Sequence, residues 1–294
     1  MNRLIMLFGT LAIASSCNKD DAIVVVDASQ RAACNRVYEY LPAPGQFINE
    51  TYAPRTMEEA CAWAKKQLGS KYGYVSLGSF GGCVVVGFDH PVACTGGYDL
   101  AIDGNPLDTS SEPGIVWVMQ DENGDGLPND TWYELRGSEY GKPETWQDYA
   151  VTYYRPSEPD AGIAWTDDRG QSGTIARVSY HRQSYYPAWV GDDSYTLRGT
   201  RLEARNRFDG VQWINPPYEW GYADNFSSID RLTDNGMNAN RFRIADAVRA
   251  DGLPAGLAHI DFVKVQTGVL AQSGGLGETS TEVFAIRDLN FPAE

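Results

Sequence analysis

The sequence predicts an all-β fold, specifically an antiparallel β-sandwich of the jelly-roll type with long loops and one short N-terminal helix. Three observations predict this class. Short apolar or alternating segments recur from residue 74 onward, the chain contains 30 glycines and 17 tyrosines, and helices and strands do not alternate along it. We find no internal repeat, which argues against a propeller or a solenoid.

The first 17 residues have the pattern of a lipoprotein signal peptide. Arg3 precedes an apolar run from Leu4 to Ile13, and small residues lead from there to Cys17. The run is too short to remain as a membrane-spanning helix. The pattern resembles a bacterial lipobox, in which Cys17 would be lipidated, and the following CNKDD resembles the acidic export tag of Bacteroidetes surface lipoproteins. We therefore expect a lipid anchor at the outer face of the outer membrane; a plain secreted protein cut nearby is the alternative.

The rest of the chain is expected to form a tether, residues 18–35, and one jelly-roll-like domain, residues 36–294. No later stretch has the 18 or so consecutive apolar residues of a membrane span. The formal charge of −15, from 39 acidic and 24 basic residues, argues against nucleic acid or anionic lipid as a partner. The three histidines lack metal-ligand spacing, which argues against a zinc site.

A single helix is predicted after the Pro- and Gly-containing segment 41–50. Thr56 and Glu59 have the spacing of a capping box, and Gly69 is a stop signal. The expected buried face consists of Met57, Ala60, Cys61, Ala64 and Leu68. We expect this helix to pack at the edge of a sheet.

Further along the chain, short segments rich in β-branched and aromatic residues are bounded by turn residues, which indicates strands. The expected strands are 74–77, 83–88, 98–102, 115–119, 132–135, 149–154, 175–180, 196–204, 241–244, 259–266 and 281–286.

An even number of cysteines remains after Cys17, and this favours disulfides in an oxidising compartment. They are Cys34, Cys61, Cys83 and Cys94. Cys83 and Cys94 flank VVVGFDHPVA, so a strand, a turn and a return strand would bring them opposite each other and leave Cys34 for Cys61. The sequence leaves all three connectivities open, and four free buried thiols are the alternative.

The segment 114–135, GIVWVMQDENGDGLPNDTWYEL, joins two predicted strands by a loop with the spacing of a calcium site. The candidate metal positions are Asp121, Asn123, Asp125, Leu127, Asn129 and Asp130. Alternating acids around Gly126 can direct several oxygens at one ion, and Ca²⁺ takes about six to eight. The twelfth position of the EF-hand template is Trp132, so Asp130 or Glu134 is expected to supply the missing carboxylate. We predict a structural Ca²⁺; a metal-free hairpin turn is the alternative.

Several segments resemble a group of Bacteroidetes surface lipoproteins. They are YVSLGSFGGCVVVGFDHPV (74–92), GGYDLAIDGN (96–105), the segment 111–135 and IDFVKVQTGV (260–269). The resemblance covers about residues 38–290, and it implies a jelly-roll body. It also implies a companion of an outer-membrane uptake system, in a setting of cobalamin capture.

Two loops dense in aromatic residues, 180–195 and 213–225, are the predicted ligand-binding surface. The candidate residues are His181, Arg182, Tyr185, Tyr186, Trp189, Asp192, Trp213, Tyr218, Trp220, Tyr222 and Asp224. Flat rings suit stacking on a sugar or a corrin, while neighbouring acids and Arg give direction. The alternative is that these rings pack under long loops at the ends of the sandwich.

These observations predict a lipoprotein that captures a nutrient ligand without chemical change and hands it to a TonB-dependent outer-membrane transporter. Cobalamin or another corrinoid is the ligand implied by the resemblance, and it would need one broad pocket between the aromatic loops. A glycan, favoured by the aromatic residues and the fold class, would need an open groove or a ring-lined platform. An adhesion module would have no concave aromatic site.

Catalysis is the minority alternative. The sequence contains neither G-x-S-x-G nor H-E-x-x-H. In a glycan-active hydrolase or lyase, His181 with Asp192 or Asp224 would be the acid and base to test.

Overall fold

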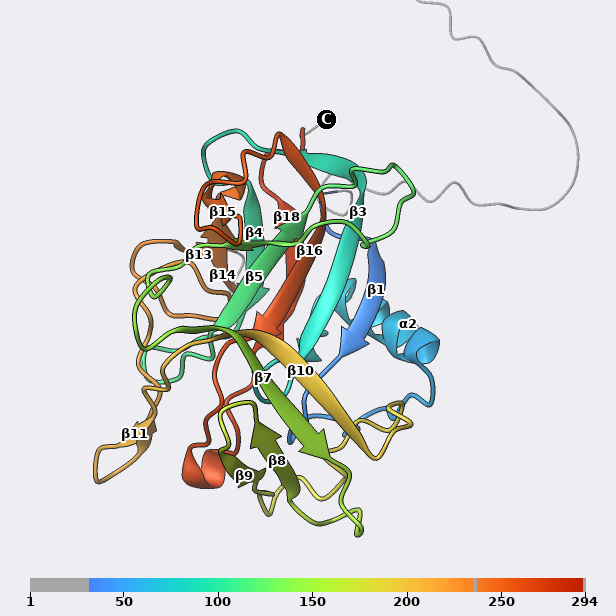
Figure 1. The fold of residues 1–294 in the computed structure, drawn as a ribbon, viewed down its shortest axis with the longest axis vertical. Coiled ribbons are helices and arrows are strands. Elements are labelled where there is room, and N and C mark those ends of the chain that lie inside the picture. The colour runs from blue at the N-terminus through green and yellow to red at the C-terminus, as the bar shows by residue number, and fades with distance from the viewer. Residues whose placement is uncertain (1–31, 235–236, 293–294) are drawn as a thin grey trace, which may run out of the picture.

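The computed structural model describes residues 32–234 and 237–292, and these residues form an all-β sandwich (Figure 1). The prediction of an antiparallel sandwich with long loops and one short N-terminal helix is confirmed. Cys17, the rest of the predicted signal peptide and residues 18–31 of the predicted tether lie outside the described residues. No helix in the described part of the chain is long and apolar enough to cross a membrane.

The largest sheet has six strands in the order β1-β3-β16-β5-β6-β15. The strands are β1 (Arg36–Leu41), β3 (Cys83–Ala93), β16 (His259–Thr267), β5 (Gly114–Met119), β6 (Tyr133–Leu135) and β15 (Ala247–Val248). Alternate side chains of a strand point to opposite faces of the sheet. On the three central strands, one face carries the fully buried valines Val84, Val86, Val116, Val118, Val263 and Val265. This valine face is the inner layer of the sandwich.

A four-stranded sheet packs against the valine face. Its order is β13-β14-β4-β18, with β13 (Arg231–Asp234), β14 (Met237–Phe242), β4 (Leu100–Gly104) and β18 (Ala285–Asp288). Leu100, Ile102, Phe242 and Ile286 from this sheet join the valines in the main hydrophobic core. In Figure 1, β4 and β18 lie behind β5 and β16.

A second four-stranded sheet extends the molecule at the lower end of Figure 1. Its order is β10-β7-β8-β9, with β10 (Ser194–Arg201), β7 (Trp146–Tyr154), β8 (Ile163–Asp167) and β9 (Ser172–Ile175). It has its own core, which includes Phe80, Tyr149 and Tyr153. The remaining elements are β2 (Val75–Ser76) paired with β17 (Glu282–Val283), β11 (Arg207–Phe208) paired with β12 (Trp213–Ile214), and the 3₁₀ turns η1 (Ile244–Asp246) and η2 (Gly274–Leu276).

The strand expected at 175–180 is wrong, because β9 ends at Ile175. The residues that follow form a loop held by a side chain: the Val178 N–H donates to Tyr185 Oη at 3.1 Å. The Val178 N–H therefore bonds to the Tyr185 hydroxyl group instead of to the backbone carbonyl of a neighbouring strand.

The α-helix of the described residues, α2 (Met57–Leu68), begins and ends where predicted. Thr56 Oγ1 accepts the N–H of Glu59 at 3.1 Å, and Gly69 N–H donates to carbonyls of the last turn. The buried residues are Ala60, Ala64 and Leu68, as expected. Met57, expected on the same face, is 36% exposed.

The predicted disulfides are wrong for this structure, in which Cys34, Cys61, Cys83 and Cys94 are free thiols. β3 starts at Cys83 and continues to Ala93, so no turn separates Cys83 from Cys94. Cys83 lies opposite Gln266 and Ala93 opposite His259, so seven residue steps of β16 at about 3.3 Å place the Cys83 and Ala93 Cα atoms roughly 23 Å apart, whereas bridged Cα atoms lie within about 7 Å. Burial raises the pKa of the Cys34 and Cys83 thiols to about 12, so both remain protonated.

Candidate ligand-binding site

The two aromatic loops do not form the predicted shared surface, because most of their rings lie in the interior. Tyr185, Tyr186, Trp189, Tyr218 and Tyr222 are all buried. Their polar atoms find backbone partners: Tyr186 Oη donates to the Asp192 carbonyl at 2.8 Å, and Trp189 Nε1 donates to the Tyr40 carbonyl at 3.1 Å. The alternative, in which these rings pack under long loops, is the observed arrangement.

The other residues predicted for this surface are spread over separate places. His181 Nδ1 lies 2.6 Å from Glu50 Oε1, and the hydrogen bonds of the described residues include none from its ring to Asp192 or Asp224. Arg182 and Asp192 are exposed, Trp213 contacts the Phe208 ring, and Trp220 lines a hollow of about 250 Å³. His181 therefore pairs with Glu50, and the acid–base pair with Asp192 or Asp224 stays a prediction.

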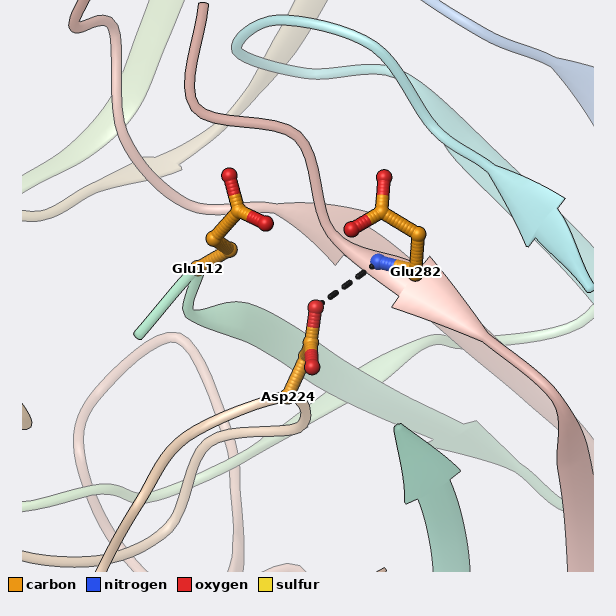
Figure 2. Close-up of side chains that lie close together, drawn as sticks. All are labelled: Glu112, Asp224 and Glu282. Atoms are coloured by element: carbon orange, nitrogen blue, oxygen red, sulfur yellow. Dashed lines mark hydrogen bonds between the residues drawn. The ribbon is translucent and has the colours of Figure 1, made fainter. Parts of the chain in front are cut away.

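Asp224 is 1% exposed and belongs to a different environment. Its carboxylate lies beside those of Glu112 and Glu282 in the interior, a group that we call the carboxyl cluster (Figure 2). One Asp224 oxygen accepts the backbone N–H of Glu282 at 2.9 Å.

A site that the sequence did not predict lies on the outer face of the six-stranded sheet. The strand register places one residue from each strand in a single row across the sheet. In strand order the row is Glu39, Val85, Lys264, Trp117, Glu134 and Val248. On the central strands these residues alternate with the buried valines, so the row faces away from the main core.

This row forms the floor of a groove that we call the cross-sheet groove. Two adjoining hollows, of about 480 Å³ and about 320 Å³, share Trp132 and Lys264. The larger hollow is lined by Trp117, Trp132, Glu134, Tyr140, Gln147, Asp148, Arg198, Gly199, Thr200, Val248, Arg249, Ala250 and Lys264. The smaller hollow is lined by Tyr38, Glu39, Met57, Val85, Pro128, Trp132 and Lys264. Five inter-strand spacings of about 4.8 Å make the floor roughly 24 Å long.

Two hydrogen-bond donors on the groove floor have no acceptor among the described residues, the half-buried Lys264 Nζ and the buried Trp117 Nε1. Lys264 Nζ lies 4.7 Å from the ring centroid of Trp117 and 5.1 Å from that of Trp132. Among the described residues, no carboxylate oxygen lies within 4.0 Å of this ammonium group. Trp117 Nε1 is buried and has no partner in the described part of the chain. A buried donor without an acceptor costs about 1 to 3 kcal/mol, so the Trp117 indole N–H is unusual in a folded protein. The half-buried Lys264 ammonium group remains within reach of a ligand in the groove.

Burial raises the pKa of both carboxyl groups on the groove floor. Glu134 is 6% exposed, and burial raises its pKa to about 7, although Thr200 Oγ1 donates to its Oε2 at 2.5 Å. Burial also raises the pKa of Glu39 and lowers that of Lys264. The floor therefore offers both donors and acceptors to a polar ligand at neutral pH, with aromatic rings between them.

The predicted calcium loop, residues 121–130, forms one wall of the groove through its Pro128. Tyr38 Oη donates to the Gly126 carbonyl at 3.1 Å, and the Asp121 N–H donates to Asp261 Oδ2 at 2.8 Å. These bonds attach the loop to the sheet beside the groove, so its conformation influences the position of Trp132.

The side chains of the calcium loop hold its own backbone. The Asp121 carboxylate accepts the N–H groups of Gly124 and Gly126 at 2.8 and 2.9 Å, and both glycines have positive φ. The Asn129 amide donates to Asp125, which lowers the pKa of that carboxyl group. Glu134 lies on the groove floor, so Asp130 is the remaining candidate for the missing calcium carboxylate.

The groove residues carry a signal that the sequence analysis did not use. Trp117 stands between Val116 and Val118, and Lys264 stands between Val263 and Val265. A ring or a charge between two core valines marks the outer face of a strand that is otherwise apolar. The chain matches no known family model and no curated protein.

Proposed function

We propose that the cross-sheet groove captures a nutrient ligand at the cell surface without chemical change, for hand-over to a TonB-dependent outer-membrane transporter. The observation that carries the proposal is Lys264 Nζ, which lies beside the indole rings of Trp117 and Trp132 on the groove floor and has no carboxylate partner within 4.0 Å among the described residues. A ligand that has both flat faces and acceptor atoms would pair with the Lys264 ammonium group and cover the rings.

A linear glycan is the ligand that this geometry favours. The groove is long and open, and it is lined by Trp117, Trp132 and Tyr140. Sugar rings stack on indoles, while their hydroxyl groups can accept from Lys264 and donate to Glu134. A corrinoid, implied by the family resemblance, is the second candidate, because the larger hollow of about 480 Å³ leaves room for a broad ligand.

The spacing of the floor carboxyl groups favours binding over hydrolysis. Glu39 and Glu134 stand on β1 and β6, which are four strand spacings apart. At about 4.8 Å per spacing they are roughly 19 Å apart, whereas glycosidase pairs are about 5 to 10 Å apart. Asp148, at the rim, forms an ion pair with Arg198 at 3.0 Å.

The anchoring proposal rests on the sequence pattern around Cys17. A Cys17→Ser variant should be released from the membrane fraction of the producing cell. Continued anchoring of this variant would rule out lipidation at Cys17.

The loop 121–130 is proposed to hold a structural Ca²⁺ that keeps this groove wall in place. Support comes from its alternating Asp and Asn side chains, from the two glycines with positive φ, and from its attachment to β1 and β16 beside the groove.

Isothermal titration tests the binding function. The purified protein is titrated with a panel of soluble linear polysaccharides and with cyanocobalamin. We expect heat with one of the two classes, and at least about tenfold weaker binding in Trp132→Ala, which is about 1.4 kcal/mol.

Tyr180→Ala is the matched control, because this 83% exposed ring belongs to one of the aromatic loops and lies outside the groove. Its affinity should equal that of the unchanged protein. Equal loss in Tyr180→Ala and Trp132→Ala, or no heat with either ligand class, would contradict the proposal.

A further inference from the structure

Three carboxyl groups from distant segments meet inside the protein (Figure 2). Glu112 precedes β5, Asp224 lies in the loop before β13, and Glu282 is on β17. One oxygen from each lies within 4.8 Å of the other two. Two oxygens that bind one calcium ion at about 2.4 Å can be at most about 4.8 Å apart. The spacing of the carboxyl cluster therefore suits a single ion.

The backbone fixes these carboxyl groups in place. Asp224 accepts the N–H of Asn105 on Oδ1 and that of Glu282 on Oδ2, both at 2.9 Å. Glu112 Oε1 accepts the N–H of Ser280 at 3.1 Å. Asp224 also has a positive φ of 51°, a conformation that costs free energy for a residue other than glycine. The fold thus keeps Asp224 at this point despite local strain.

A fourth carboxyl group supplies an independent observation. A cavity of about 280 Å³ is lined by Glu112, Glu282 and Glu278. Glu278 is 2% exposed, and its Oε1 accepts the Gln46 N–H at 2.7 Å. Its Oε2 is buried and has no partner among the described residues. An unpartnered buried carboxylate oxygen beside a cavity indicates a missing cation or donor.

No basic side chain of the described residues forms an ion pair with these acids. In the described part of the chain, the ion pairs within 4.0 Å include no Lys, Arg or His partner for Glu112, Asp224, Glu278 or Glu282. Burial raises the pKa of Glu112 to about 7 and that of Glu278 to about 8, and it raises the pKa of Asp224 and Glu282 well above the ordinary range. Without a cation the group retains protons, and a bound cation would displace them.

We propose that the carboxyl cluster binds one divalent cation, Ca²⁺, which enters through the cavity lined by Glu112, Glu278 and Glu282. The donors are all oxygens, which hard cations prefer, and the several carboxylates match the charge of Ca²⁺. The ion would join β17 to the segment that leads into β5, the strand that carries Trp117. This site is separate from the loop 121–130, so it makes a second calcium site.

Calcium stoichiometry and affinity, measured by titration of the purified protein, test the proposal. Glu112→Gln and Glu282→Gln keep the side-chain shape and remove a charge, and each should weaken binding of one calcium ion by at least about tenfold. Glu203→Gln, an exposed acid outside the cluster, is the matched control and should bind calcium as the unchanged protein does. Asp125→Asn should keep the cluster ion. Unchanged calcium binding in both Glu112→Gln and Glu282→Gln would overturn the proposal.

A second measurement keeps the test decisive if an amide variant fails to fold. The thermal midpoint of Asp125→Asn is compared in calcium and in a chelator. The cluster ion predicts a higher midpoint in calcium, and the increase should be larger at pH 8 than at pH 5 because protons compete for the same oxygens. A midpoint that depends on pH but not on calcium would show a proton-sharing network alone and would overturn the proposal.

Discussion

The two faces of the six-stranded sheet are built from the same strands but carry different kinds of side chain. On the inner face, six valines are fully buried against the β13-β14-β4-β18 sheet: Val84, Val86, Val116, Val118, Val263 and Val265. On the outer face, Lys264 and Trp117 occupy the alternate positions of β16 and β5. Because side chains alternate along a strand, one face can form the main core while the other carries charged and aromatic groups, although Trp117 also packs against a smaller cluster around Ile115.

The two faces also differ in how they contribute to stability. Each buried valine contributes about 1.5 to 2 kcal/mol by leaving water. On the outer face, the Lys264 ammonium group and the Trp117 indole N–H are taken out of water without a hydrogen-bond acceptor. This desolvation costs more folding free energy than their contacts with neighbouring rings return, unless a partner is supplied. Such locally unfavourable groups are expected at functional sites.

The largest expected effect comes from substitutions at two consecutive residues of β5. Val116→Asp places an unpaired carboxylate in the core and should cost at least about 4 kcal/mol of unfolding free energy. Trp117→Asp places the same carboxylate in the groove and should cost about 2 kcal/mol or less. Urea unfolding measures both. Equal losses would mean that Trp117 belongs to the core as much as Val116 does.

A smaller effect concerns pH. The pKa of Glu134 is raised to about 7 by burial, so the folded protein binds its proton more tightly than the unfolded chain does. Stability should therefore fall as pH rises from about 4.5 to about 7, by up to about 3 kcal/mol from this group.

The Glu134→Gln variant tests this assignment, since it should lose that part of the pH dependence while the exposed control Glu203→Gln keeps it. Urea unfolding at several pH values gives the two profiles. If Glu134→Gln retains the full fall between pH 4.5 and 7, the titrating group lies elsewhere.

A further effect concerns the groove wall. Asp125→Ala removes a candidate ligand of the loop ion and should lower stability in saturating calcium by about 2 to 3 kcal/mol, the linkage expected at about 100 times the Kd. Thermal unfolding with calcium and with a chelator measures the difference. The same loss under both conditions would show that Asp125 holds the turn without an ion.

Local signals made much of the fold predictable. Thr56, Glu59 and Gly69 set the ends of α2 because caps depend on neighbours within a few residues. The valine alternation in β3, β5 and β16 likewise identified strands. The turn expected between Cys83 and Cys94 was wrong because β3 continues through His90 and Pro91, with an irregular register opposite β16. A change of register depends on the partner strand, which the sequence does not specify.

The candidate site was less predictable, because it depends on contacts between distant segments. The rings of Tyr185 and Tyr186 were expected at the surface, but a second core beneath the β10-β7-β8-β9 sheet covers them. The cross-sheet groove requires the register of six strands taken from residues 36 to 267. The alternation around Trp117 and Lys264 was visible in the sequence, whereas their position in one row was not.

Lys264→Met tests the central claim most directly, because it removes the charge and nearly preserves the shape of the side chain. The change removes a cation–π contact of about 0.5 to 2 kcal/mol and also removes a half-buried charge without a partner among the described residues, so stability should change by less than about 1 kcal/mol. We predict that titration with the polysaccharide panel shows binding at least about tenfold weaker, with an unchanged thermal midpoint. Unchanged affinity together with a large fall in the midpoint would instead make Lys264 a structural residue and contradict the assignment of the groove.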